Sequence, residues 1–166
     1  MATASKNLSS YNEKDIPDAS GFSFVVIVSE WNTEITYALK EGCTQTLLKH
    51  GVKNENIKVI HVPGSFELPV AASIYLSKQI NGKMPNAVIC LGSVIRGETP
   101  HFDYVCQVVS QGIKDVAIKY NIPVIFGVLT DNNWQQAKDR SGGKHGNKGI
   151  EAALTAIKMA HLIENF

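Results

Sequence analysis

The chain has 166 residues, of which 44% are hydrophobic and 19% charged, and its formal net charge is +1. This size and composition predict one globular domain with its own core. The near-neutral charge argues against a nucleic-acid-binding surface or a basic membrane patch, because either one normally carries a strong cationic excess.

The first 20 residues are polar and lack the apolar stretch of a secretory signal. They also lack Arg and carry Glu13, Asp15 and Asp18, which argues against a mitochondrial transit peptide. No apolar run reaches the roughly 20 residues that a membrane span needs. We therefore expect a cytoplasmic protein. Residues 1–20 are expected to be a flexible segment that a neighbouring subunit orders, as a strand added to its sheet, and residues 21–166 to form the domain.

Four apolar runs rich in β-branched residues predict strands, at 22–29, 58–63, 87–95 and 123–130. Their hydrophobicity is continuous rather than alternating, which is typical of parallel strands buried on both faces.

Helical spacing of apolar residues follows each strand, at 32–50, 67–80, 100–120 and 150–165. We expect Gly51 to end the first helix and the second to end near Asn81-Gly82. Alternating strands and helices predict an α/β, single-domain, three-layer sandwich. Its four-stranded parallel sheet would be flanked by helices in a flavodoxin-like arrangement. Ligands of such folds bind at the carboxyl ends of the strands.

The three cysteines are odd in number and widely separated, and no CxxC pair is present. This pattern argues against a disulfide framework and against a zinc site. Cys43, Cys90 and Cys106 are expected to be buried, reduced thiols.

Polar segments follow the first two strands. Trp31 precedes Asn32, an expected helix N-cap, and is either a plate for ligand stacking or a core residue. In the segment 63–69, Gly64 and Ser65 can present backbone groups to a ligand, and Glu67 can accept hydrogen bonds from hydroxyls. A simple capped turn explains this segment equally well.

The end of the third strand, residues 92–99, nearly matches a P-loop. However, Glu98 replaces the lysine and would repel a triphosphate, so an NTPase is a poor reading. We expect Thr99 to be the N-cap and Pro100 the first helical residue, with a helix start able to bind one phosphate. His101 would lie in the first turn, where the helix dipole disfavours the imidazolium, so it is either a general base or a structural histidine.

The segment 139–149 contains Arg140, Lys144 and Lys148 among four glycines. It is either a flexible loop that binds an anion or a solvated connector. Phe126, inside the fourth strand, is most simply a core residue. From these residues alone, we expect a cofactor-independent enzyme acting on a small, phosphorylated and hydroxylated substrate.

Taken together, Trp31-Asn32 and the segments 62–69, 92–105, 123–130 and 140–149 resemble the lumazine synthase family in order and spacing. The resemblance extends from about Phe22 to the C-terminus. It implies condensation of 5-amino-6-(D-ribitylamino)uracil with 3,4-dihydroxy-2-butanone 4-phosphate, the penultimate step of riboflavin biosynthesis. A Schiff base, phosphate elimination and ring closure are implied, with no cofactor and no metal.

The resemblance also implies roles for individual residues. Trp31 would stack on the pyrimidine, Glu67 would accept hydrogen bonds from the ribityl chain, and His101 would transfer protons. Arg140 would pair with the phosphate and, with Lys148 and Phe126, would come from across a subunit interface. The other implied substrate-binding residues are Asn32, Ser65, Phe66, Ser93, Val94, Ile95, Glu98 and Thr99.

The segment 131–134 is less usual for the family and is expected to start a helix outside the site, and two site positions also depart from the family pattern. Many members have Phe or Tyr where this chain has Trp31, which preserves a stacking surface. Glu98 stands where Ala or Ser is common, so its role rests on its backbone N–H.

The resemblance implies a homo-pentamer or a shell of twelve pentamers, and the short loop 142–149 favours the 60-subunit shell. Implied partners are the two small substrates, copies of this chain and riboflavin synthase, with no nucleic acid and no membrane. Two alternatives stay open: a non-catalytic flavin or lumazine carrier or shell protein of the same fold, and a riboflavin synthase of related fold.

Overall fold

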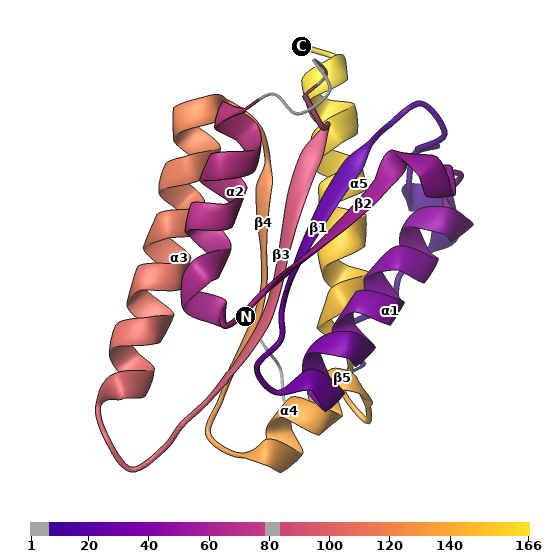
Figure 1. Ribbon diagram of the computed structural model, residues 1–166. Coiled ribbons are helices and arrows are strands. Elements are labelled where there is room, and N and C mark those ends of the chain that lie inside the picture. Colours follow the sequence, from indigo (N-terminus) through magenta and orange to yellow (C-terminus); the bar gives the residue numbers. More distant parts are fainter. Residues whose placement is uncertain (1–6, 79–83) are drawn as a thin grey trace.

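The computed structural model describes residues 7–78 and 84–166, which form a parallel four-stranded sheet between two layers of helices (Figure 1). The strands are β1 (Phe24–Ser29), β2 (Ile57–Val62), β3 (Ala87–Ile95) and β4 (Val124–Asp131). Their order in the sheet is β2-β1-β3-β4, and all neighbours are parallel. The predicted α/β sandwich is confirmed.

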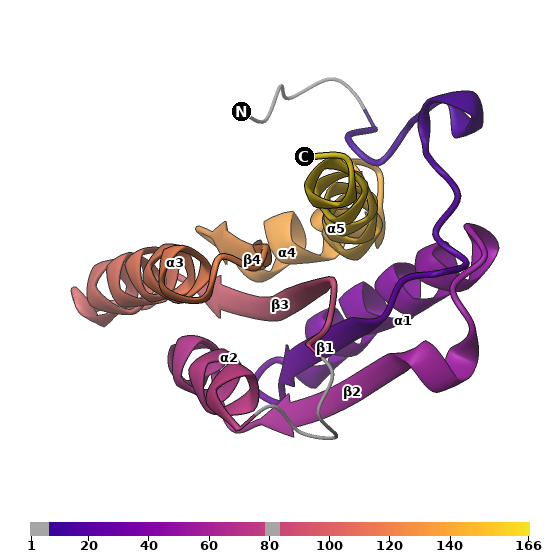
Figure 2. The same ribbon diagram turned by 90° about the horizontal axis from the view of Figure 1, so that it is seen from above.

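Helices cover both faces of the sheet, as Figure 2 shows from above. The helices are α1 (Thr33–Lys49), α2 (Leu68–Ser77), α3 (His101–Tyr120), α4 (Trp134–Arg140) and α5 (Lys148–Glu164). Side chains of α1, α4 and α5 pack in one core cluster, and those of α2 and α3 pack in another. The sheet separates these two clusters.

The central strands explain why the sequence is continuously apolar there. Every residue of β1 is buried, with Val26 and Val28 facing α1 and α5 while Val25 and Ile27 face α2 and α3. Each fully buried aliphatic side chain contributes about 1.5–3 kcal/mol to folding. β2 lies at the sheet edge and is mostly exposed or half-buried, so burial on both faces is wrong for that strand.

The end of α1 follows the predicted pattern. Gly51 has a φ of 94°, in the left-handed region that favours glycine. Its N–H donates to the Leu48 carbonyl at 3.0 Å, and the Val52 N–H donates to the Leu47 carbonyl at 3.1 Å. These two bonds form a Schellman motif, which satisfies the last carbonyls of the helix.

The expected helix starts need two corrections. Asn32 precedes α1, but its side chain does not cap the helix; its φ is 59° and its amide donates to the Ser93 carbonyl at 3.1 Å. α3 begins at His101 with Pro100 as N-cap, so Thr99 lies outside the helix. The expected end of the second helix near Asn81-Gly82 lies outside the described residues.

The segment expected to be a flexible loop is ordered. The segment 139–149 begins with the last two residues of α4 and continues with an antiparallel pair of short strands, β5 (Ser141–Gly143) and β6 (Gly146–Asn147). The pair is called the hairpin 141–147. Asn147 is 8% exposed and holds it in place. Its amide donates to the Ala38 carbonyl at 2.9 Å and to the Ser141 carbonyl at 3.3 Å, and its oxygen accepts the Gly149 N–H at 2.8 Å. The flexible-loop expectation is therefore wrong.

Residues 7–20 run across the layer formed by α1 and α5 (Figure 2). They contain one 3₁₀ turn, Glu13–Asp15, and no strand. Tyr11 lies within hydrogen-bonding distance of His50, 3.3 Å from its Nε2, and Glu13 forms an ion pair with Lys49. Ordering of this segment by a neighbouring subunit stays a prediction.

The partial burial of His50 predicts a pH dependence of stability. Burial lowers the pKa of His50 below its ordinary value of 6.5, assisted by Lys49 and opposed by Glu13. Between these two values the unfolded chain binds a proton that the folded chain does not. The stabilisation is therefore complete above pH 6.5 and is lost as the pH falls through the lower, folded-state pKa.

We expect acidification to lower the unfolding midpoint of the wild type more than that of His50→Gln, which lacks the titrating ring. Thermal unfolding of both proteins at pH 7.5 and 5.5 tests this. Parallel shifts of the two midpoints would contradict the assignment.

The cysteines are unpaired, and two of the three are fully buried. Burial raises the pKa of the Cys43 thiol and raises that of Cys90 to about 12. Cys106 is only half-buried, so the expectation of full burial is wrong there. Separately, no helix of the described ranges combines the length and the apolar character needed to cross a membrane.

Candidate active site

A cleft of about 420 Å³ lies at the carboxyl end of the sheet. Its walls come from the end of β1, the turn before α2, the end of β3 and the start of α3. The predicted residues that line it are Trp31, Ser65, Phe66, Glu67, Ser93, Val94, Ile95, Thr99 and His101. Gly64, Gly97, Phe102 and Val105 complete the lining. The side chains of Phe102 and Val105 were missed in the sequence, because apolar residues of a helix read simply as core.

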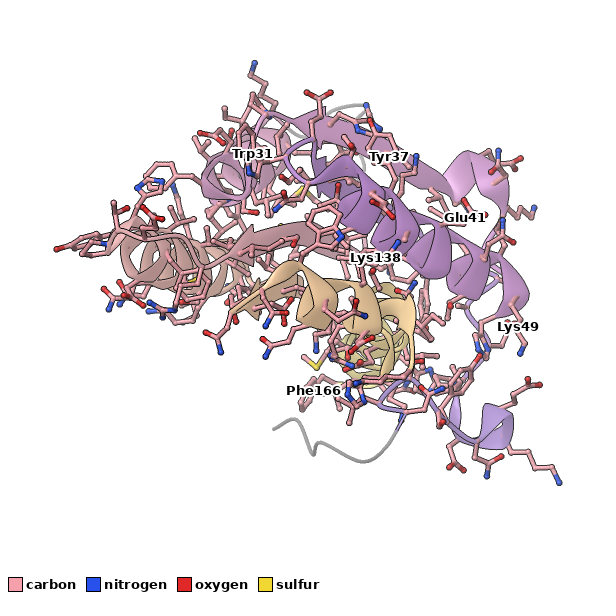
Figure 3. The ribbon with its side chains drawn as sticks, turned by 90° about the horizontal axis from the view of Figure 1, so that it is seen from below. Trp31, Tyr37, Glu41, Lys49, Lys138 and Phe166 are labelled. Carbon is pink, nitrogen blue, oxygen red and sulfur yellow. The ribbon has the colours of Figure 1, made fainter. Side chains whose placement is uncertain are left out.

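Two exposed aromatic side chains border the cleft. Trp31 is 71% exposed and lies at the surface beside the start of α1, as Figure 3 shows from below. Phe66 is 52% exposed. Because exposed aromatic rings lose apolar contact with water when a planar ligand covers them, these two favour a heterocycle. The alternative of a core tryptophan is wrong.

Two buried hydroxyls of the cleft can take part in ligand binding. Ser65 is 6% exposed and Ser93 is 1% exposed, and neither Oγ has a hydrogen-bond partner within the described protein. Ser65 packs so closely that a Cβ at Gly92 would lie 2.5 Å from its Oγ. A glycine at position 92 is therefore required, and polar groups of a ligand would relieve the cost of the unpaired hydroxyls.

The loop 96–100 is held by Arg96. Its guanidinium donates two hydrogen bonds to Asp103, at 2.7 and 3.2 Å, and lies 4.1 Å from the centre of the Phe102 ring. The hydrogen bonds from Arg96 lower the pKa of the Asp103 carboxyl. Thr99 and His101 line the cleft beside the positive end of α3. Glu98 is exposed and does not line the cleft.

Arg140 and Lys148 lie apart from the cleft of their own chain. Arg140 Nη2 is 2.9 Å from Glu151 Oε1, and Lys148 Nζ is 3.1 Å from Glu151 Oε2. Arg140 Nη1 also donates to the His145 carbonyl at 3.0 Å. One carboxylate thus holds two cations that can bind a dianion. Glu151 was missed, although its place three residues after Lys148 on a helix is a readable signal.

Asp131, at the end of β4, is a second carboxylate that the sequence reading left out. Its Oδ2 is buried without a hydrogen-bond partner in the described protein. Burial raises the pKa of this carboxyl, and the positive charge of Arg140 acts in the opposite direction. The electrostatic surroundings of Arg140 therefore include Asp131 as well as Glu151.

Phe126 lies in β4, which is an edge strand, and does not line the cleft. It is half-buried against the core cluster of α2 and α3. A half-buried ring on an edge strand leaves part of its surface available to another molecule. Within the described residues, no three His, Cys, Asp or Glu side chains form a cluster that could hold a metal ion.

Sequence comparisons relate the chain to a set of enzymes. Residues 21–164 match the model of the family described as 6,7-dimethyl-8-ribityllumazine synthase. A protein of that name from Parabacteroides distasonis is 54% identical over 97% of this chain and 98% of its own length. A protein of the same name from Cytophaga hutchinsonii is 55% identical over 96% of this chain and 97% of its own length. Another, from Porphyromonas gingivalis, is 52% identical over 98% of this chain and 98% of its own length.

Proposed function

The chain belongs to the 6,7-dimethyl-8-ribityllumazine synthase family, and we propose that its cleft forms a complete active site with Arg140 and Lys148 of a neighbouring copy. Its function is that of the family: an enzyme of riboflavin biosynthesis that condenses 5-amino-6-(D-ribitylamino)uracil with 3,4-dihydroxy-2-butanone 4-phosphate.

The cleft takes the pyrimidine in this proposal. Trp31 stacks on the ring, since it is the most exposed aromatic side chain of the cleft. Glu67, from the turn before α2, accepts hydrogen bonds from ribityl hydroxyls, with Ser65 and Phe66 beside it. The heterocycle contacts the end of β3, at Ser93, Val94 and Ile95. Asn32 holds the end of this strand in place, because its amide donates to the Ser93 carbonyl.

The phosphate lies between two sources of positive potential. One is the loop before α3, where the backbone at Glu98 and Thr99 faces the positive end of the helix dipole. The other is the pair Arg140 and Lys148. A guanidinium can pair with phosphate through two hydrogen bonds. Phe126 of the neighbouring copy completes the apolar wall.

The chemistry needs proton transfers rather than electron transfers. The pyrimidine amine attacks the ketone carbon, and loss of water gives the Schiff base. Removal of a proton from the four-carbon unit allows the C–O bond of the phosphate ester to break, which releases inorganic phosphate. Ring closure then releases a second water. His101 is placed to carry these protons. Because no step has a net change of oxidation state, we propose a cofactor-independent transferase that moves a four-carbon unit to the pyrimidine.

The assembly follows from the separation of the two half-sites. If the cations of each copy complete the site of the next copy, the contact is head-to-tail, and such contacts form a ring when the rotation between copies closes. We propose a homo-pentamer, and twelve pentamers as the complete shell, with riboflavin synthase as a further partner. We also propose a cytoplasmic location, which the unpaired thiols favour.

One assay tests the proposed chemistry. The purified protein is mixed with both substrates and a chelator, and lumazine absorbance and phosphate release are followed together. We expect one phosphate to be released for each lumazine formed, at the same rate with and without the chelator. Tight lumazine binding without turnover would instead favour a carrier protein.

Subunit complementation tests the shared site. His101→Ala keeps the cations and Arg140→Ala keeps the intact cleft, so mixed rings contain some complete sites. After random reassembly of equal amounts, about a quarter of the sites pair an intact cleft with intact cations in a head-to-tail ring. We expect activity to return to about that fraction of wild type. Persistent inactivity of mixed rings, verified by mass spectrometry, would place both residues in the site of one chain.

A further inference from the structure

We propose that residues 7–9 are a strap that positions Arg140 for phosphate binding, with Ser9 as the positioning residue. This inference rests on the proposed role of Arg140. It assigns a function to a segment that precedes the matched family region, residues 21–164.

The strap contacts the hairpin 141–147 through two hydrogen bonds. The Leu8 N–H donates to the His145 carbonyl at 3.1 Å, and the Ser9 Oγ accepts the Asn147 N–H at 3.1 Å. Asn7 orients the strap, because its Oδ1 accepts from the Ser9 N–H at 3.0 Å and from the Ser9 hydroxyl at 2.9 Å. The Ser9 hydroxyl therefore donates to the strap and accepts from the hairpin.

One carbonyl connects the strap to Arg140. The His145 oxygen that accepts from Leu8 also accepts from Arg140 Nη1 at 3.0 Å. The other terminal nitrogen of Arg140 lies 2.9 Å from Glu151, and the side chain is only 15% exposed. The guanidinium orientation therefore depends on one hydrogen-bond acceptor, the His145 carbonyl, and one ion-pair partner, Glu151, and the strap fixes the first of them.

The turn of the hairpin is shaped to receive the strap. Gly146 has a φ of 89°. A Cβ at this position would lie 2.3 Å from Asn7 Oδ1 and 2.4 Å from Ser9 Oγ, which is closer than atoms can approach. A glycine is therefore required both by the backbone conformation and by the strap.

A second attachment keeps the strap close to the hairpin. Tyr11 contacts His50, and Glu13 pairs with Lys49, both at the end of α1. Ser9 and Ser10, the two residues between Leu8 and Tyr11, thus lie between two fixed points, the hairpin contact of Leu8 and the contact of Tyr11 with His50. A short tether between fixed points reduces the conformational freedom that is lost when Ser9 docks.

The chain offers matched pairs of variants for the test. Ser9→Ala removes the hydroxyl bonded to Asn147, whereas Ser10→Ala removes the exposed hydroxyl of the next residue. Gly146→Ala places a methyl group against the strap. Gly142→Ala brings the same kind of backbone strain into the same hairpin, at a φ of 121°, with only Asn147 Nδ2 nearby at 3.8 Å.

Steady-state kinetics with each substrate varied separately is the measurement. We expect Ser9→Ala to raise the KM for the butanone phosphate roughly two- to tenfold, the effect of one net hydrogen bond, and the inhibition constant of inorganic phosphate likewise. The KM for the pyrimidine should stay unchanged, because its contacts come from the cleft. Gly146→Ala should show the same pattern, and Ser10→Ala and Gly142→Ala should not.

The control Arg140→Ala separates this inference from the proposed function. If Arg140→Ala is inactive while Ser9→Ala and Gly146→Ala match their controls, the strap has no positioning role and the shared site stands. If both KM values rise equally in Ser9→Ala, the strap is only structural and the inference is overturned. Normal activity of Arg140→Ala would overturn the role of Arg140 and the strap together.

Discussion

Arg140→Ala is expected to lower kcat/KM for the butanone phosphate by about 10²–10³-fold, the usual effect of removing one preorganised group that stabilises developing charge. Arg140 is the only residue of the proposed site whose side chain can form two parallel hydrogen bonds with the phosphate. Loss of this group should weaken binding of the phosphorylated substrate and slow the step in which phosphate leaves. Glu151 stays paired with Lys148 in the variant, so the chain should still fold.

Two further variants sharpen this test. Lys144→Ala removes a mostly exposed cation of the same segment, paired with Asp139 at 3.2 Å, and should leave kcat/KM near normal. Arg140→Lys keeps the charge but not the planar fork, and should recover only part of the activity. Lumazine binding, measured by fluorescence titration, should survive in all three variants. Near-normal turnover of Arg140→Ala would remove this residue from the site.

His101→Ala is the second variant with a large expected effect, a reduction of kcat by about 10²–10⁴-fold for loss of a general base. The residue begins α3 and lines the cleft beside Phe102 and Val105. Product binding should change little, because stacking and ribityl contacts come from other elements. His61→Ala, on the edge strand β2, is the control and should keep full activity.

Single-turnover kinetics and lumazine titration together decide the role of His101. A slowed chemical step with intact lumazine binding is the expected result. If binding and turnover fall by the same factor, His101 shapes the cleft and does not transfer protons.

The sheet and its helices were predictable because burial on both faces leaves a direct trace in sequence. β1 and β3 are central strands, so nearly every residue in them is apolar. β2 gave the same signal through Val59 and Ile60, although its edge position leaves most of it accessible. Position within a sheet depends on pairing between distant segments, which a run of residues does not encode.

The hairpin 141–147 could not be predicted for a related reason. Its composition, three glycines with one lysine, is typical of a mobile loop. What orders it is Asn147, which bonds to Ala38 and Ser9, residues 109 and 138 positions away. Local propensity carries no information about such contacts.

The cleft was predictable to a larger extent, because parallel strands bring their carboxyl ends to one edge. That rule alone places the segments after β1, β2 and β3 together. Nothing in the local sequence indicates that Asn32 adopts a left-handed conformation and donates to the Ser93 carbonyl rather than capping α1. A side chain that can cap a helix can equally bond elsewhere, and tertiary contacts decide between these partners.

The carboxylate of Glu151 bears on whether the chain folds before or after it associates with other subunits. Without it, Arg140, whose side chain is 15% exposed, would be a nearly buried cation in the isolated chain, and such a charge is strongly destabilising when unpaired. Because Glu151 comes from the same chain, Arg140 has an ion-pair partner in each newly made subunit before that subunit contacts another. A monomer can therefore fold before it associates with other subunits.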